Sequence, residues 1–227
     1  MTKNFTILFD LDGTLVDTAP DLMLAHNHVM KKFGYPTKST DDIRNLVGKG
    51  AGALIGRSIW GQAKKEFGKV QDDEIKKQMV KEFIDFYGKN IINQSTLING
   101  VLDFLKWCKD RNISMAVCTN KQEHLAIDLL KKIKIYDFFE YVAGSNTFDY
   151  CKPDPRHLTS VIEILDGDVQ KSLMIGDSET DANAAKAADM PVILLENGYT
   201  EKNSEEIYHN HLIKDFIGVE KIVSKYL

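Results

Sequence analysis

Two aspartates near the start of the chain have the type and spacing that a cation site or a proton-transfer site needs. Asp10 and Asp12 follow an apolar run, residues 5–9, which predicts a strand buried on both faces. Side chains two apart on a strand point to the same side, so both carboxylates are predicted to face one place. Like charges there cost free energy unless a cation or a shared proton offsets their repulsion. The pair therefore indicates a chemical site, and the alternative is an exposed turn of the kind that Asp and Gly13 often form.

Polar residues also follow a later apolar segment. Residues 115–118 predict a strand that ends at Thr119 and Asn120, whose side chains can donate hydrogen bonds to phosphate oxygens. The alternative is that they only cap the helix that follows. Lys152 is followed by Pro153, which restricts the backbone around a lysine that could enter a cleft, although most lysines are simply solvated. These residues are candidates for binding an anionic group.

A third apolar segment, residues 173–175, leads to Asp177, and Asp181 lies one helical turn farther on. Asp177 could merely balance the helix dipole or cap free N–H groups. It is also predicted to face Asp10 and Asp12, which places three carboxylates together. Hard oxygen ligands of this kind suit Mg²⁺, so the sequence predicts a magnesium site.

The order of the predicted elements explains why these side chains would meet. Residues 20–92 have helical patterning, whereas helices alternate with short apolar strands from residue 99 onward. This order predicts an α/β fold with a doubly wound parallel sheet, helices on both faces, and ligands outside the carboxyl ends of the strands. The strands that follow the first are predicted at 115–118, 141–144, 173–175, 192–195 and 211–213. We expect a core of residues 1–17 and 94–227 with a helical insert at 18–93.

Composition narrows the classes of function. The net charge of -4 argues against broad electrostatic binding to nucleic acid, and no apolar segment has the length of a membrane span or a signal peptide. Three cysteines without C-x-x-C spacing fit a reducing compartment, so we expect a cytoplasmic protein. The expected partner is a small molecule, with no nucleic acid or membrane, and the chain is expected to be a monomer or a homodimer.

With these motifs in order, the chain resembles the haloacid dehalogenase-like superfamily. The resemblance spans nearly the whole chain, and the insert matches the helical cap of that superfamily. Within it, the chain looks most like the phosphoglycolate phosphatases, although Cys151 stands where a basic residue often precedes the motif lysine. The segments that carry the subgroup resemblance are Leu15-Val16-Asp17-Thr18-Ala19-Pro20, Val47-Gly48-Lys49-Gly50, Thr119-Asn120-Lys121 and Asn197-Gly198-Tyr199-Thr200.

The resemblance implies a Mg²⁺-dependent phosphatase that acts on a small phosphate monoester, with 2-phosphoglycolate favoured. Asp10 would attack phosphorus to give an aspartyl-phosphate, and Asp12 would act as general acid and base. Asp10, Asp177 and the backbone carbonyl of Asp12 would bind the metal, and Asp181 would orient a metal-bound water or Lys152. The groups expected to stabilise charge on the transferred phosphoryl group are Thr119, Asn120 and Lys152.

The segment Gly48-Lys49-Gly50 is a candidate for recognising the rest of the substrate, because its glycines permit close approach and Lys49 could meet a carboxylate. A helix-ending turn with a solvated lysine is the alternative, and Arg57 is another candidate cation. The pairs His26/His28 and His209/His211 are expected to be structural rather than metal ligands, because neither has matching ligands nearby in the sequence.

Two other functions stay open at this point. A sugar-phosphate mutase of the same superfamily would return the phosphoryl group to its substrate instead of losing it to water. A regulatory protein would bind a phosphorylated ligand without useful turnover. The presence of Asp10, Asp12, Lys152 and Asp177 argues against the second of these.

Overall fold

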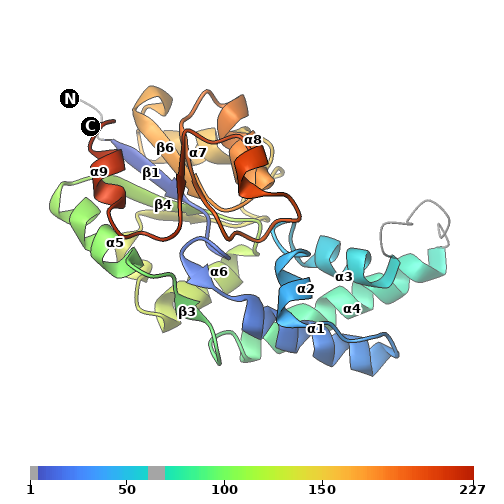
Figure 1. The fold of residues 1–227 in the computed structure, drawn as a ribbon. Coiled ribbons are helices and arrows are strands. Elements are labelled where there is room, and N and C mark those ends of the chain that lie inside the picture. Colours follow the sequence, from blue (N-terminus) through green and yellow to red (C-terminus); the bar gives the residue numbers. More distant parts are fainter. Residues whose placement is uncertain (1–4, 61–69) are drawn as a thin grey trace.

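A six-stranded parallel sheet forms the centre of the computed structural model, which describes residues 5–60 and 70–227 (Figure 1). The strand order is β5-β4-β1-β6-β7-β8, and each neighbouring pair is parallel. The α/β prediction is therefore confirmed. The strands are β1 (Thr6–Phe9), β4 (Ser114–Cys118), β5 (Tyr141–Ala143), β6 (Ser172–Gly176), β7 (Val192–Leu195) and β8 (His211–Ile213).

Helices cover both faces of this sheet because its strands are apolar on both sides. In β1, Ile7 and Phe9 join the hydrophobic cluster on one face, whereas Leu8 joins the cluster on the other. The first cluster includes α5 (Val101–Asp110), α6 (Glu123–Lys132) and α9 (Val219–Val223), and the second includes α7 (Arg156–Ile164) and α8 (Glu179–Ala187). Short 3-10 helices lie at Tyr136–Phe138, Val169–Lys171 and Ser204–Glu206.

The helices between β1 and β4 lie to one side of the sheet (Figure 1). Helices α1 and α4 pack against each other, and α3 packs against α4. One face of α4 is largely buried, with Met79, Phe83 and Tyr87 at most 3% exposed. These helices are α1 (Ala19–Phe33), α2 (Thr40–Arg44), α3 (Ala51–Trp60) and α4 (Val70–Lys89). The division at residues 18–93 into a separate domain stays a prediction.

An antiparallel ribbon lies where the chain passes between the sheet and these helices. Its strands are β2 (Val16–Asp17) and β3 (Thr96–Leu97), and a pair of two-residue strands is too short to show a periodic pattern in the sequence. The described residues include no helix with both the length and the apolar character that crossing a membrane requires.

The first strand is shorter than the sequence argument assumed. Strand β1 ends at Phe9, so Asp10 and Asp12 lie in the loop after it and not on the strand. Gly13 turns that loop at φ +84°, and a Cβ there would stand 2.2 Å from a carboxylate oxygen of Asp177. The loop therefore passes close to the end of β6, and its turn, not strand periodicity, sets the direction of Asp12.

Candidate functional site

The register of the central strands brings the predicted site residues to one edge of the sheet. Phe9 of β1 lies opposite Val117 of β4 and Ile175 of β6. β1 ends in this row, and β4 and β6 end one residue beyond it, so the residues that follow, Asp10, Thr119 and Asp177, leave the sheet at one edge. This edge is the one at which ligands collect in doubly wound folds, at the point where the strand order reverses.

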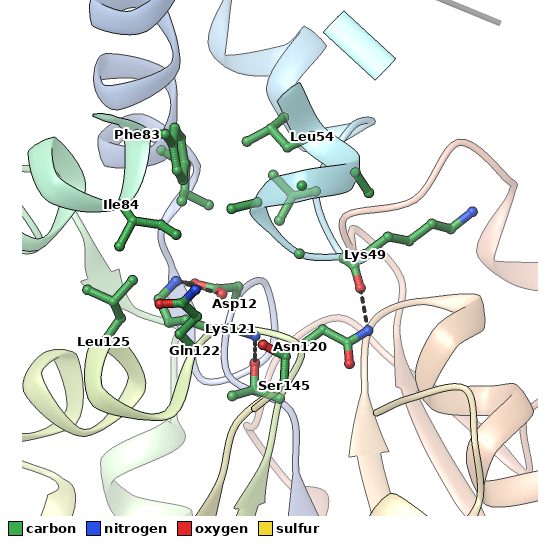
Figure 2. Close-up of a pocket in the computed structure, with 18 of the residues that line it drawn as sticks. Asp12, Lys49, Leu54, Phe83, Ile84, Asn120, Lys121, Gln122, Leu125 and Ser145 are labelled. Carbon is green, nitrogen blue, oxygen red and sulfur yellow. Dashed lines mark hydrogen bonds and ion pairs between the residues drawn. The ribbon is translucent and has the colours of Figure 1, made fainter. Parts of the chain in front are cut away.

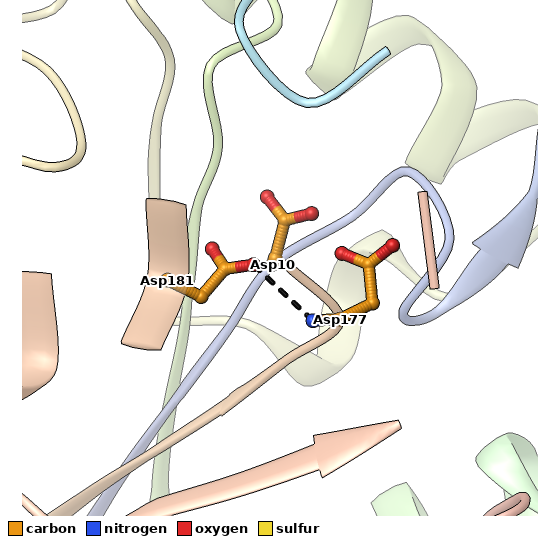
Figure 3. A group of neighbouring side chains, drawn as sticks. All are labelled: Asp10, Asp177 and Asp181. Atoms are coloured by element: carbon orange, nitrogen blue, oxygen red, sulfur yellow. Dashed lines mark hydrogen bonds between the residues drawn. The ribbon is translucent and has the colours of Figure 1, made fainter. Parts of the chain in front are cut away.

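Three carboxylates, Asp10, Asp177 and Asp181, form a buried cluster at this edge (Figure 3). One oxygen from each lies within 4.8 Å of the others, and the three residues are at most 7% exposed. The sequence argument placed the Asp12 side chain here, but the third carboxylate is that of Asp181. The structure therefore corrects the composition of the predicted cluster.

Hydrogen bonds hold the cluster in place. One oxygen of Asp177 accepts the Tyr199 N–H at 2.6 Å, and the other accepts the Thr14 hydroxyl at 3.3 Å. One oxygen of Asp181 accepts hydrogen bonds from the hydroxyl and the N–H of Ser178. Ser178 is the N-cap residue of α8, and the two residues form a capping box. These partners fix the positions of the Asp177 and Asp181 carboxylates.

Lys152 is the cation that faces the cluster. Its Nζ lies 2.7 Å from an oxygen of Asp10 and 2.6 Å from an oxygen of Asp181, and the residue is 3% exposed. Burial alone would lower the pKa of Lys152, but the charges of Asp10 and Asp181 outweigh it and raise that pKa. Lys152 is therefore a fixed positive charge beside Asp10.

One buried lysine does not balance three buried carboxylates. Burial raises the pKa of Asp10 to about 7, against the opposing effect of Lys152. Burial and the charge of Asp10 likewise raise the pKa of Asp177. Burial and, to a smaller extent, the neighbouring carboxylates thus disfavour the charged forms of Asp10 and Asp177, and a bound cation would offset this cost. Hard carboxylate oxygens at this spacing fit Mg²⁺, so the donor set suits the predicted metal.

Asp12 points to different partners. Its carboxylate accepts the Thr18 hydroxyl at 2.6 Å, and both of its oxygens lie 2.7 Å from Nζ of Lys121. Lys121 is 8% exposed, and its Nζ lies 4.6 Å from the centre of the Tyr87 ring. Lys121 was not among the predicted catalytic or binding residues. The sequence feature that could have identified Lys121 is its position directly after Thr119 and Asn120, at the edge of the sheet where the aspartates also lie.

The predicted phosphate-binding residues lie between the cluster and the helical insert. Thr119 is 1% exposed and lines the same cavity as Asp10 and Asp12. The Asn120 amide donates to the carbonyl of Gly48 at 3.1 Å and to the carbonyl of Lys152 at 3.0 Å. Asn120 therefore connects the insert to the core beside the cluster.

The loop of Gly48, Lys49 and Gly50 approaches the core closely. Gly48 and Gly50 have φ values of +93° and +80°, and a Cβ on Gly50 would stand 3.2 Å from the carbonyl oxygen of Asn120. Figure 2 shows that the Lys49 side chain extends away from Asp12. In this structure the backbone of the loop, and not the lysine, faces the site.

The remaining candidates of the sequence analysis lie outside the carboxylate cluster. Arg57 pairs with Glu201 and donates to the carbonyl of Leu46, and Cys151 lines the cavity near Asp10. The histidines contact other side chains or the backbone: His26 contacts Ser58, His28 contacts Glu82, His209 contacts the carbonyl of Ile207 and His211 contacts Tyr226.

Tyr199 is a second residue that the sequence analysis did not single out. It is 2% exposed, and its N–H holds Asp177. Its hydroxyl accepts the N–H groups of Thr18 and Ala19, both at 2.8 Å, and donates to Asp17 at 2.6 Å. Tyr199 therefore joins the start of the helical insert to the carboxylate cluster.

Comparison with known proteins identifies the family. The model for "Haloacid dehalogenase-like hydrolase" matches residues 7–195, which include the cluster and Lys152. The chain belongs to the haloacid dehalogenase-like hydrolases. The family assignment confirms the resemblance that the ordered motifs indicated.

Named relatives of this haloacid dehalogenase-like chain are phosphatases. A phosphoglycolate phosphatase of Caulobacter vibrioides is 39% identical over 95% of this chain and 89% of its own length. A phosphoglycolate phosphatase of Mesorhizobium japonicum is 36% identical over 92% of this chain and 90% of its own length. A crystal structure described as a predicted phosphoglycolate phosphatase from Haemophilus somnus has a TM-score of 0.87 at 30% identity and covers 98% of this chain and 99% of that one. The sequence-based prediction of a phosphatase is thereby confirmed.

Proposed function

We propose that this phosphatase is a Mg²⁺-dependent phosphomonoester hydrolase in which Asp10 is the nucleophile. The observation that carries the proposal is the position of the Asp10 carboxylate, at the ligand-binding edge of the sheet between Lys152 and Asp177. A nucleophilic carboxylate needs a charge partner that aligns it and a means of lowering its repulsion from an anionic substrate. Lys152 supplies the first, and the carboxylate cluster supplies the ligands for a cation that does the second.

The two aspartates of the first loop divide the covalent steps between them. An oxygen of Asp10 forms a bond to phosphorus as the bond from phosphorus to the ester oxygen breaks, and Asp12 gives its proton to that departing oxygen. Asp12 then takes a proton from water, whose oxygen bonds to phosphorus and releases phosphate from Asp10. The separate partners of the two carboxylates favour this division, because Lys152 holds Asp10 whereas Lys121 and Thr18 hold Asp12.

The other polar groups stabilise and orient the charges. Thr119, Asn120 and Lys152 would donate to the non-ester oxygens of the phosphoryl group. Asp10, Asp177 and the backbone carbonyl of Asp12 would hold Mg²⁺, which when bound neutralises charge on the nucleophile and the phosphoryl oxygens. Asp181 would fix Lys152, whose Nζ it contacts at 2.6 Å.

The helical insert, residues 18–93, would act as a cap that excludes bulk water from the site. Support comes from the contact between the Gly48 carbonyl and the Asn120 amide, which brings the insert against the core beside Asp10. Gly48, Lys49 and Gly50 then form part of the wall around the leaving group.

The favoured substrate is 2-phosphoglycolate, a small phosphate ester, because the relatives named above are phosphoglycolate phosphatases. Phosphate release from 2-phosphoglycolate and from an aryl phosphate, with and without Mg²⁺, tests the class. We expect turnover of both esters that depends on Mg²⁺. Absence of Mg²⁺-dependent turnover on every phosphomonoester would refute the proposal, and isomerised sugar phosphate without free phosphate would favour the mutase.

A matched pair of variants separates catalysis from binding. Asp10→Asn removes the nucleophile, and Asp103→Asn makes the same change at a side chain that is 89% exposed on α5. We expect the first variant to lose turnover while it still binds the ester, and the second to keep full activity. Turnover of Asp10→Asn equal to that of the unchanged protein would show that Asp10 is not the nucleophile. Binding of the ester without turnover in the unchanged protein would support a binding protein in place of an enzyme.

A further inference from the structure

The cavity above the first aspartates has a mainly apolar wall. It has a volume of about 260 Å³ and is lined by Asp10, Asp12 and Thr119 at one end. Figure 2 shows apolar side chains from the helical insert and from α6 around the other end. The members of this apolar wall are Leu54, Val80, Phe83, Ile84, Tyr87 and Leu125.

The apolar wall is larger than the leaving group of 2-phosphoglycolate can cover. The volume approaches the lower limit, roughly 300 Å³, of pockets that enclose drug-sized ligands. Glycolate, the leaving group of 2-phosphoglycolate, has a single methylene to place against apolar side chains. An apolar surface that stays wet in the complex contributes no binding free energy, so a substrate with a larger apolar group would use this wall better.

The charges in the cavity limit where a carboxylate of the leaving group can bind. Among the described residues that line it, the basic side chains are Lys49 and Lys121. The Lys49 side chain extends away from Asp12 (Figure 2). Lys121 instead places Nζ 2.7 Å from both oxygens of Asp12, beside the group that would protonate the ester oxygen. A carboxylate on the carbon that bears this oxygen would therefore lie next to Lys121.

We propose that the substrates are phosphate esters of 2-hydroxy acids that carry an apolar side chain. This inference rests on the function proposed above and specifies its leaving group. The carboxylate binds Lys121, the ester oxygen faces Asp12, and the side chain lies against the apolar wall. 2-Phosphoglycolate is then the smallest member of the class.

A series of esters tests the wall in the unchanged protein. The series runs from 2-phosphoglycolate through 2-phospholactate to the phosphate ester of 2-hydroxy-4-methylpentanoate, each assayed for phosphate release with Mg²⁺. Full burial of each added carbon is expected to raise kcat/KM by about fourfold, which for the four added carbons of the longest ester gives about 250-fold over 2-phosphoglycolate. Burial of about half of them still gives about tenfold or more. A steady fall in kcat/KM along the series would overturn the inference and leave the proposed phosphatase standing.

A second comparison tests the carboxylate. The phosphate ester of 3-methylbutanol has the same apolar group as the longest ester but lacks its carboxylate. We expect the carboxylated ester to have a kcat/KM about tenfold higher or more, and Lys121→Met to reduce this ratio to near one. The ratio is informative even if contact with Asp12 makes the variant slow on both esters. No preference for the carboxylated ester in the unchanged protein would overturn the assignment to Lys121.

Two isoleucines on the same helix provide a matched control for the wall. Ile84 lines the cavity and Ile75 lies outside it, and both are partly buried on α4. Ile84→Phe is expected to lower the ratio of kcat/KM for the longest ester over 2-phosphoglycolate by about tenfold, whereas Ile75→Phe leaves this ratio unchanged. An equal effect of the two changes would contradict the inference. If the protein hydrolysed neither the esters of the series nor an aryl phosphate, the proposed function and this inference would both be overturned.

Discussion

The hydroxyl of Tyr199 is expected to be a major contributor to stability at the junction between the helical insert and the core. It accepts two backbone N–H groups, those of Thr18 and Ala19, at the beginning of α1, and it donates to Asp17. Thr18 and Ala19 are fully buried, so water cannot replace the hydroxyl without a rearrangement of the loop. Tyr199→Phe keeps the ring and removes only these three hydrogen bonds.

The magnitude follows from the two N–H groups that lose their acceptor. A buried donor without a partner costs about 1–3 kcal/mol, and Asp17 retains its ion pair with Arg44 at 2.7 Å. We therefore expect Tyr199→Phe to lower the free energy of unfolding by about 2–6 kcal/mol. For a chain of this length, each kcal/mol lowers Tm by roughly 2–4 °C.

Tyr87→Phe is the matched control for this change. Tyr87 is 1% exposed, and its hydroxyl has no hydrogen-bond partner among the described residues. Its removal is expected to leave the free energy of unfolding unchanged or to raise it by up to about 1–3 kcal/mol, because no hydrogen bond is lost and a buried hydroxyl without a partner is removed. Urea unfolding followed by circular dichroism measures both variants. If Tyr199→Phe were as stable as Tyr87→Phe, the role given to the Tyr199 hydroxyl would be wrong.

Further changes test other parts of the site and of the fold. Gly198→Ala puts a Cβ 1.9 Å from the carbonyl oxygen of Asp177, so the substitution must displace that residue of the carboxylate cluster. We expect the Mg²⁺ affinity, measured by calorimetry, to fall about tenfold or more, and an unchanged affinity would contradict this. Asp21→Asn weakens a carboxylate that accepts three backbone N–H groups from the segment after α4. We expect urea unfolding to show a loss of about 2 kcal/mol in the free energy of unfolding, and no such loss for the exposed control Asp103→Asn. Equal stability of the two variants would show that Asp21 does not hold this segment. Burial lowers the pKa of His157 from 6.5 to about 4, so its contribution to stability is complete above pH 6.5 and lost as the pH falls toward 4. Relative to His157→Gln, the unchanged protein should lose up to about 3 kcal/mol over this range, and parallel stability curves would refute the shift.

The sequence predicted the position of those candidate site residues that directly follow an apolar strand. Asp10, Thr119 and Asp177 each follow an apolar strand, and parallel strands bring their carboxyl ends to one edge. That argument needs no knowledge of side-chain contacts. The same reasoning correctly predicted a helical pattern for the insert, because the buried face of α4 repeats with the period of a helix.

The rest depended on contacts between distant segments. Strand periodicity placed Asp12 beside Asp10, but β1 ends first and the turn at Gly13 directs Asp12 to Lys121, which is 109 residues away in the sequence. Asp181 enters the cluster from the first turn of α8, where it forms a capping box with Ser178, the N-cap residue. No local pattern reports which carboxylate a lysine will meet, so these partners appear only once the chain is folded.

The most direct test of the account is the detection of phosphate on Asp10 during turnover. The enzyme is mixed with 2-phosphoglycolate and Mg²⁺, quenched in acid within the first turnover, digested and analysed by mass spectrometry. The account predicts an acyl phosphate on the peptide that contains Asp10, formed before free phosphate appears and absent in Asp10→Asn. Phosphate release at a normal rate with no adduct at any quench time, or with the adduct on another residue, would contradict it.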